Sequence, residues 1–456
     1  MPEPRTLGTA PTTAPSYRHA IAGCLEAAIG RHGLTPTELS RWLALLGPAL
    51  AALQSDYRGG RLPQLSIAEQ TADLAAAEAA FQRLARGAET IVFLGVGGSR
   101  LGGQALAQLG GWNVPGSANE RQKQRPRTRF YDNLDGETLA AALASCDLSL
   151  TRFVVTSKSG STPETLVQAL AAVAAVQRAG LATRMRELFL AITEPARPGA
   201  ANGLRTLCEA LDIPLLEHHP GIGGRYAVLS AAGLLPALAR GLDVRAIRAG
   251  AGEVIGALLA TRSPRGLAPA EGAAVAVGLA RERGVRTLVL MPHADRLGRL
   301  AHWYTQLWAE SLGKGGQGTM PIACLGPLEQ RLQLLMDGPR EYLISLVRTP
   351  SAGLGPRIAR ELAACAGVEY LADHTAGDLV AAQAMAMPEA LIEAGRPVRT
   401  FDLPLLDERS VGALMMHFML ETILAARLLG VDPFDQPAVE SAKAFTRRRV
   451  AALPKP

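Results

Sequence analysis

The 456-residue sequence is poor in cysteine and aromatic residues and has no long apolar run. Its five cysteines are far apart, odd in number and form no CxxC pair, so neither a disulfide framework nor a zinc site is expected. No apolar run approaches the roughly 20 residues that span a membrane, and residues 1–17 lack the apolar core of a signal peptide. We therefore expect a cytoplasmic protein that has no membrane partner.

A strong net charge and base-stacking side chains are also missing. Aromatic residues make up 4% of the chain, and the net charge of +6 is small for this length. The densest basic stretches, 121–129 and 447–449, contain no interleaved aromatic residues that would stack bases. The sequence therefore predicts no nucleic-acid partner, and a mildly basic enzyme that handles an anionic metabolite fits the composition as well.

Common nucleotide- and metal-binding motifs are absent as well. The glycine-rich segment 90–103, TIVFLGVGGSRLGG, has Arg100 where the dinucleotide fingerprint needs its last glycine. The only Gly-Lys pair, Gly313-Lys314, lacks the flanking residues of a P-loop. The histidines have no metal-ligand spacing with carboxylates or cysteines, so no metal is predicted. The glycines of segment 90–103 indicate either a ligand-binding loop or only a tight strand–helix turn.

Short β-branched or apolar runs alternate with helical stretches in both halves of the chain. Such alternation predicts parallel sheets covered by helices on both faces. The predicted fold class is therefore α/β, with two lobes, each a parallel sheet flanked by helices, and helical N- and C-terminal segments. The predicted strands are Thr90–Leu94, Thr128–Tyr131, Arg152–Thr156, Leu188–Ile192, Pro214–Leu216, Arg286–Met291, Gln317–Cys324, Tyr342–Val347 and Val398–Asp402.

The same patterns divide the chain into parts. We expect an N-terminal tail and helices over 1–70, a first sheet domain over 71–244, a second sheet domain with its helical connection over 245–405, and a C-terminal helical region over 406–456. Within the first part, His19–Leu53 has a helical pattern with a break around Gly33–Pro36.

A hydroxyl-rich segment, residues 153–166 with the sequence FVVTSKSGSTPETL, includes the end of the third predicted strand. Ser161 and Glu164 have the spacing of a capping box, and Pro163 suits the first turn of a helix. The free N–H groups of a helix start, with several hydroxyls and Lys158 beside them, suit an anion. A well-capped helix without a ligand explains the same residues, but the neighbouring glycine-rich loop favours a phosphate site.

Two charged residues lie beside glycines in the middle of the chain. Arg225 follows three glycines and precedes an apolar helix, so it either faces an oxyanion or is an ordinary surface charge. Glu310 lies near the end of an amphipathic helix predicted over Arg296–Lys314, with Gly313 as its C-cap. Its i, i+4 spacing from Lys314 indicates an ordinary salt bridge, although a carboxylate at a helix end also suits a general base.

Five passages, taken in order, resemble the glucose-6-phosphate isomerase family. They are GVGGSRLGG (95–103), TSKSGSTPETL (156–166), GIGGRYAVLSAAGLLP (221–236), QLWAESLGK (306–314) and GVDPFDQPAVESAK (430–443). Their order and spacing make the resemblance specific, and it extends from about residue 72 to residue 449. The resemblance implies two sugar-isomerase (SIS) domains and a reversible isomerisation of glucose 6-phosphate and fructose 6-phosphate. It also implies that no cofactor is needed and that a homodimer shares its sites between subunits.

The resemblance also implies roles for individual residues. Glu310 matches the general base that moves a proton between C2 and C1 through a cis-enediolate, and Arg225 matches the residue that stabilises the developing charge. Gln436 and Lys443 match active-site residues of the C-terminal helix, and Lys443 is implied in ring opening. The implied substrate-binding residues, most of them hydroxyls and amides around the phosphate, are Gly98, Ser99, Ser157, Lys158, Ser159, Gly160, Ser161, Thr162, Thr165 and Gly224.

One departure from the family concerns the histidine that helps to open the sugar ring. Family members carry D-Q-H or G-Q-H, whereas Glu329-Gln330 is followed here by Arg331, in a segment shorter than the family pattern. Arginine stays protonated and cannot act as a base. We therefore expect slower turnover of cyclic substrate, with ring opening left to Lys443 or to spontaneous opening. The alternatives are a non-catalytic sugar-phosphate-binding protein, and an isomerase that also converts mannose 6-phosphate.

Overall fold

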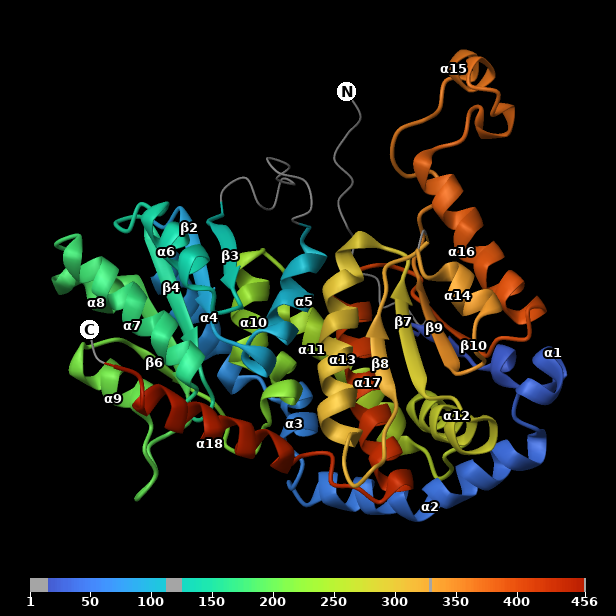
Figure 1. Cartoon of the computed structure of the whole chain (residues 1–456), viewed down its shortest axis with the longest axis horizontal. Helices are drawn as coiled ribbons and strands as arrows, with labels where there is room; N and C mark the ends of the chain where they lie inside the picture. The colour runs from blue at the N-terminus through green and yellow to red at the C-terminus, as the bar shows by residue number, and fades with distance from the viewer. Residues whose placement is uncertain (1–14, 112–124, 328–329, 455–456) are drawn as a thin grey trace.

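Figure 1 shows the computed structural model of the chain, which describes residues 15–111, 125–327 and 330–454. Two five-stranded sheets lie side by side, one in each lobe, with a layer of helices between and around them. The predicted α/β class with two parallel-sheet lobes is therefore confirmed. All nine predicted strands are present, although about half of their ends shift by one residue and one strand begins three residues later.

The first sheet has the strand order β3-β2-β4-β5-β6, and all of its pairings are parallel. Its strands are β2 (Thr90–Leu94), β3 (Arg127–Tyr131), β4 (Thr151–Thr156), β5 (Phe189–Thr193) and β6 (Leu215–Glu217). Strands β2, β4 and β5 are buried along their whole length because helices cover both faces. Helices α4 (Ala72–Ala85) and α10 (Ala231–Ala239) cover one face, and α6 (Gly136–Ala144), α7 (Pro163–Arg178) and α9 (Gly203–Ala210) cover the other.

The second sheet has the order β1-β10-β9-β7-β8. Strands β7 (Thr287–Pro292), β8 (Met320–Ala323), β9 (Tyr342–Arg348) and β10 (Val398–Asp402) are parallel to one another. The N-terminal strand β1 (Arg18–Ala20) joins the free edge of β10 in the antiparallel direction. The prediction of a helix beginning at His19 was therefore wrong, because strand pairing and the stacking of the His19 ring on Phe401, with centroids 4.6 Å apart, hold this segment extended.

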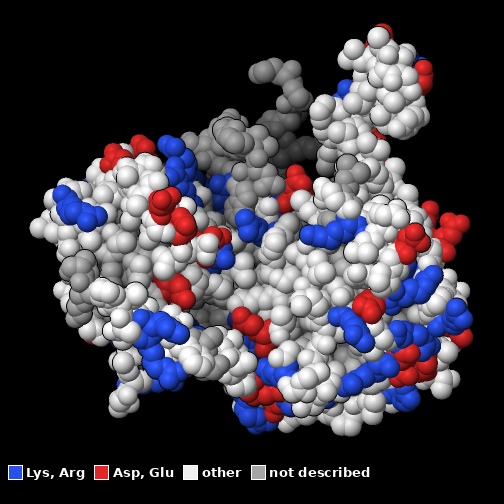
Figure 2. Space-filling model, in the orientation of Figure 1, with Lys and Arg blue, Asp and Glu red and all other residues white. Residues whose placement is uncertain are grey.

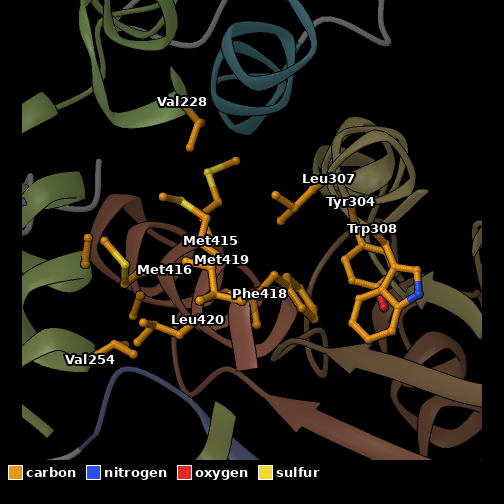
Figure 3. Close-up of a cluster of buried hydrophobic side chains, with 14 of the residues drawn as sticks. Val228, Val254, Tyr304, Leu307, Trp308, Met415, Met416, Phe418, Met419 and Leu420 are labelled. Carbon is orange, nitrogen blue, oxygen red and sulfur yellow. The ribbon is translucent and has the colours of Figure 1, made fainter. Parts of the chain in front are cut away.

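Helices between the two sheets form the main core. Figure 3 shows Tyr304, Leu307 and Trp308 of α13 (Gly298–Leu312) packed beside the Met415–Leu420 stretch of α17 (Glu408–Leu429), with Val254 of α11 (Val244–Ala260) on the other side. The helices not yet given are α1 (Glu26–Ile29), α2 (Pro36–Arg58), α3 (Pro63–Ser66), α5 (Leu101–Leu109), α8 (Met185–Leu188), α12 (Ala268–Arg283), α14 (Leu332–Asp337), α15 (Arg360–Cys365), α16 (Ala376–Glu393) and α18 (Pro437–Ala451).

Helix α17 is the central helix of this core. Among the described helices it alone is long and apolar enough, by length and composition, to cross a membrane, so the prediction that no run approaches that length was wrong. In this structure 89% of its most apolar window is buried inside the protein. The helix also carries Glu421, which accepts a 2.7 Å hydrogen bond from buried Arg399 of β10 and lies 2.9 Å from the ring of His417. These charges are matched by protein partners, as a buried core helix requires.

Candidate active site

The two loops predicted to bind phosphate meet at the carboxyl edge of the first sheet. One follows β2 and the other follows β4, and these two strands are direct neighbours in the sheet. A Cβ placed on Gly95 would lie 3.0 Å from the carbonyl oxygen of Thr156 and 3.5 Å from the Cβ of Ser99. The glycine therefore lets the backbones of the two loops touch at the edge where parallel sheets bind ligands.

The loop after β4 is folded by its own hydroxyls. Ser157 donates a 3.1 Å hydrogen bond to Thr162, and Ser161 donates a 3.0 Å bond to Ser159. Thr162 is the N-cap of α7, and no side chain caps this helix. The predicted capping box was therefore wrong, because the Ser161 hydroxyl is engaged within the loop and the helix begins one residue later. The first-turn amides of α7 have no capping side chain, which suits an anion.

Gly160 holds this loop in its shape. Its φ of 63° lies in the left-handed region, and a Cβ there would fall 1.6 Å from Oδ1 of Asn202. Asn202 in turn caps α9 by accepting from the amide of Arg205. Lys158, which was predicted to add positive charge, lies 3.4 Å from Glu194 and shares its charge with that carboxylate. Hydroxyls and amides therefore provide most of the binding capacity of the loop.

The corresponding place in the second lobe is closed. Helix α16 is the next long helix after β9, and Thr375 and Asp378 cap its start with a complete capping box. The Asp378 carboxylate accepts from the amides of Gly353 and Thr375, 2.8 and 2.7 Å away. A carboxylate at this position repels an anion, so the geometry favours phosphate in the first lobe only.

The loop after β2 also lies directly on the segment that contains Arg225. A Cβ on Gly98 would fall 2.4 Å from the carbonyl carbon of Gly224 and 2.5 Å from the amide nitrogen of Arg225. Only glycine fits at this position. The predicted substrate contacts Gly98 and Gly224 are thus packed against each other, between the loop after β4 and the arginine. Next to Ser99, Arg100 pairs with Asp132, and burial together with the charge of Arg299 lowers the pKa of the Arg100 guanidinium to about 10.

Arg225 is buried, with 3% of its surface exposed, so the surface-charge interpretation was wrong. Its Nε donates to Ser311, 2.9 Å away, and its Nη2 donates to the carbonyl oxygens of Pro433 and Asp435 at 2.6 and 2.9 Å. Its Nη1 donates to Oε1 of Gln436 at 2.8 Å and to the Glu310 carboxylate at 3.4 Å. The guanidinium therefore joins α13 to the C-terminal segment.

Glu310 lies near the end of α13, with about a third of its side chain exposed. Its Oε1 accepts a 2.8 Å hydrogen bond from Nε2 of Gln306, one helical turn earlier. Lys314 pairs instead with Asp435 at 2.6 Å, so the predicted alternative of a Glu310–Lys314 salt bridge is not the arrangement observed. A carboxylate oriented by an amide and a guanidinium, and still open to solvent, can exchange a proton with a bound molecule.

Gln306 is a site residue that the sequence analysis missed. A Cβ on Gly97 would lie 3.1 Å from its Nε2, so the Gln306 amide lies between Glu310 and the loop after β2. The signal available in the sequence was its i, i−4 spacing from Glu310 within the passage QLWAESLGK.

Two other predicted residues are placed less centrally. Lys443 lies on α18, which Figure 1 shows starting near the C-terminal end of α13 and running along the first lobe. Arg331 lies at the edge of the second sheet, where its Nη1 is 3.1 Å from Sγ of Cys324. Glu329, the start of the altered histidine string, lies outside the described residues.

The two parallel-sheet lobes flanked by helices define an α/β protein of the sugar-isomerase (SIS) fold class. A family model described as Phosphoglucose isomerase matches residues 80–320. A glucose-6-phosphate isomerase of Rubrobacter xylanophilus is 35% identical over 92% of this chain and 95% of its own length, and one of Thermus thermophilus is 34% identical over 80% and 84%. The chain therefore belongs to the phosphoglucose isomerase family, and it is an isomerase.

Solved structures share the fold of this chain. The crystal structure of a hypothetical protein from Thermus thermophilus superposes with a TM-score of 0.81 at 29% identity, over 96% of this chain and all of that one. A glucose-6-phosphate isomerase from Chlamydia trachomatis has the same fold, with a TM-score of 0.65 at 19% identity over 94% of this chain and 76% of that one.

Proposed function

We propose that the protein interconverts glucose 6-phosphate and fructose 6-phosphate through a cis-enediolate. The observation that carries the proposal is the contact between Glu310 and buried Arg225. The backbone of Arg225 lies against the loop after β2, and this loop also touches the proposed phosphate site. A carboxylate, a fixed cation and an anion site are the three groups that this reaction needs. The test is a coupled assay in which fructose 6-phosphate is added and the glucose 6-phosphate formed reduces NADP⁺ through a dehydrogenase.

The phosphate is held in this proposal by the start of α7 and the loops around it. Ser157, Ser159, Thr162 and Thr165 provide hydroxyls, and the uncapped amides of the first turn point toward the anion. Ser99 of the loop after β2 supplies a further hydroxyl from the opposite side. Binding energy from the phosphate end then holds the other end of the sugar in register with Glu310.

The proton transfer uses one carboxylate in two steps. With the aldehyde form bound, Glu310 takes the proton from C2, the C–H electron pair forms the C1–C2 double bond, and the carbonyl electrons move to O1. Arg225 stabilises the negative charge of the enediolate. The proton of the C2 hydroxyl passes to O1 within the cis-enediolate, and the electron pair left on O2 forms the ketone as the electrons of the C1–C2 double bond take the proton that Glu310 returns to C1. Gln306 and Gln436 orient Glu310 and Arg225, as their hydrogen bonds support.

Ring opening is the step for which this chain lacks the family's histidine. We propose that Lys443 assists it or that the enzyme uses sugar that has opened spontaneously. The hydrogen bond that Arg331 donates to Cys324 supports this proposal. It holds the residue that follows the altered string at the edge of the second sheet, so Arg331 does not replace the histidine in ring opening. The expected consequence is slow turnover of cyclic substrate.

A non-catalytic sugar-phosphate binder is the second candidate, favoured by the loss of that histidine. It is opposed by the retained network of Glu310, Arg225, Gln306 and Gln436, since binding alone does not need a carboxylate oriented by two donors. The coupled assay separates the two: a binder gives no NADPH while still binding fructose 6-phosphate in calorimetry. Mannose 6-phosphate, added in a parallel assay with detection of fructose 6-phosphate, tests the broader specificity.

We further propose a cytoplasmic homodimer. An arm that includes α15 projects from the second lobe in Figure 1 and carries Leu354, Leu362 and Tyr370, with 59%, 69% and 73% of their surfaces exposed. Apolar side chains on a projecting arm are typical of an interface. Sedimentation analysis tests this: Leu362→Glu with Tyr370→Glu is expected to shift a dimer toward monomer, whereas Leu405→Glu, at a similarly exposed leucine elsewhere, is not. The unpaired cysteines are consistent with a reducing compartment.

A further inference from the structure

A cavity of about 170 Å³ lies behind the active-site helix, on the side away from the phosphate loop. Its walls come from the last turns of α12, the start of β7 and the glycine-rich turn 313–319 that connects α13 to β8. Arg281 and Arg286 line it together with Gln317 and Thr319, and Val277 and Trp308 provide apolar surface. None of these residues takes part in the site described above.

The charge of this cavity is not balanced within the described part of the chain. There, neither Arg281 nor Arg286 forms an ion pair with a carboxylate, and Arg281 donates only to the amide oxygen of Gln317. Their neighbour Arg283 is paired with Glu38, and on this part of the surface most basic side chains lie beside acidic ones (Figure 2). Two unpaired guanidinium groups at one cavity attract an anion.

The shape of the cavity suits a small anion that carries a phosphate. Gly316 and Gly318 line the cavity and have φ values of 74° and 105°, so the turn brings backbone close to it beside the side chains of Gln317 and Thr319. Trp308 donates to Thr319 at 3.0 Å, which fixes the wall opposite the arginines. The volume is below the range of about 300–1,000 Å³ that drug-sized ligands occupy, which favours a ligand of a few carbon atoms.

The cavity is also connected to the catalytic groups. Lys314, at the start of the glycine-rich turn, pairs with Asp435 and donates to the carbonyl of Asp432. Arg225 donates to the carbonyl of Asp435 and to Gln436, and it contacts Glu310. A ligand that tightens the turn therefore acts on the position of Arg225 through Lys314 of the turn and Asp435, which contacts both Lys314 and Arg225.

We propose that this cavity is a regulatory site for a small phosphorylated carboxylic acid, held by Arg281, Arg286 and residues 316–319 of the turn, which changes isomerase activity without entering the active site. The site is separate from the one proposed for the sugar phosphate. Its existence therefore does not depend on the identity of that substrate.

The test uses 3-phosphoglycerate as the probe and calorimetry on the full-length protein. We expect one binding event for the probe, and it should persist in the Glu310→Gln variant when fructose 6-phosphate saturates the active site. Binding should be at least about tenfold weaker in Arg281→Gln/Arg286→Gln, because this variant loses two charge-assisted contacts. The matched control is Arg262→Gln/Arg265→Gln, which removes the same charge from exposed positions outside the cavity and is expected to bind as the parent does. Arg286→Gln alone, a single exposed substitution, is expected to weaken binding in the same direction.

Three results would overturn the proposal. They are the absence of binding at millimolar probe, complete displacement of the probe by fructose 6-phosphate, and equal weakening in the two double variants. A second measurement tests the coupling to catalysis. The probe is expected to change the kcat or KM for fructose 6-phosphate in the parent protein and not in Arg281→Gln/Arg286→Gln, and an identical response in both would show that it acts at the active site.

Discussion

Arg225 Nη1 lies 3.4 Å from the Glu310 carboxylate, while the C-terminal segment accepts hydrogen bonds from both Nη1 and Nη2 of the same guanidinium. The carboxylate proposed as general base is therefore positioned by a cation that cannot move without breaking contacts to Ser311, Pro433 and Gln436. A preorganised cation costs no reorganisation when charge develops on the substrate. Catalysis in this protein is thus expected to depend on distant parts of the chain that Arg225 joins.

Replacement of Glu310 by Gln is expected to lower kcat by about 10²–10⁴-fold, the usual contribution of a general base. The amide keeps the size of the side chain and its contact with Gln306, so the affinity for fructose 6-phosphate should change little. The coupled assay gives kcat and calorimetry gives the affinity. Glu341→Gln, at an exposed carboxylate outside the site, is the control, and full activity in Glu310→Gln would refute the assignment.

Replacement of Arg225 by Lys is expected to lower kcat by about 10²–10³-fold. Lysine keeps the charge but cannot donate simultaneously to Ser311, Glu310 and the C-terminal carbonyls. The thermal midpoint should also fall, because buried acceptors lose their partners. Arg245→Lys, at an exposed arginine paired with Glu78, controls for the substitution itself. Arg225→Lys with the parent's kcat would show that the charge alone suffices.

Gly160→Ala is expected to raise the KM for fructose 6-phosphate by disturbing the phosphate loop. The new Cβ would overlap Oδ1 of Asn202, in addition to the strain of a left-handed backbone. Gly180→Ala is a close control, since Gly180 has a φ of 74° and nothing within 4 Å of the added Cβ. Steady-state kinetics on both variants separates the overlap from the strain, and equal KM values would exclude a role for the loop in binding.

The proposed dependence on spontaneously opened sugar predicts a limit on the rate. At high enzyme concentration the conversion of fructose 6-phosphate should stop increasing in proportion to enzyme, because ring opening in water becomes limiting. If ring opening is spontaneous, Lys443→Ala should not change the enzyme concentration at which the rate stops rising in proportion. If Lys443 assists ring opening, Lys443→Ala should lower kcat. A rate that rises linearly with enzyme and reaches ordinary family values would contradict the slow-opening proposal.

Stability is expected to fall as the pH is lowered from about 6.5 toward 4. Burial lowers the pKa of His218 and of His293 to about 4, so both rings are neutral in the folded protein, and the unfolded chain binds more protons in this window. Each neutral ring contributes fully to the free energy of unfolding above the pKa that histidine has in the unfolded chain. This contribution, up to about 3 kcal/mol for each ring, is lost as the pH falls toward the folded-state pKa. Urea unfolding at pH 7.5 and pH 5 measures it. His293→Gln should flatten the pH dependence, whereas His219→Gln, at an exposed neighbour of His218, should not.

Local patterns in the sequence predicted much of the fold. The strands of both sheets have runs of apolar and β-branched residues because they are buried on both faces, and such runs are visible without knowledge of the neighbours. The amphipathic helix at α13 was predicted from its own apolar periodicity, and Leu300, Tyr304, Leu307 and Trp308 on this helix are all buried. Strand β1 was missed because a three-residue strand at a sheet edge depends on its partner β10, which is distant in the sequence.

The sequence by itself determined the α/β class, the two lobes, the glycine- and hydroxyl-rich loops and, through the order of five passages, the family. Only the tertiary structure decided that Arg225 is buried rather than exposed, that Glu310 pairs with it rather than with Lys314, that Gln306 joins the site, and that the start of α7 is uncapped while that of α16 is closed. The physical reason is that strand and helix periodicity arises from neighbouring residues, whereas the partner of a charged or polar side chain is chosen by which distant segments the packed core brings within hydrogen-bond distance.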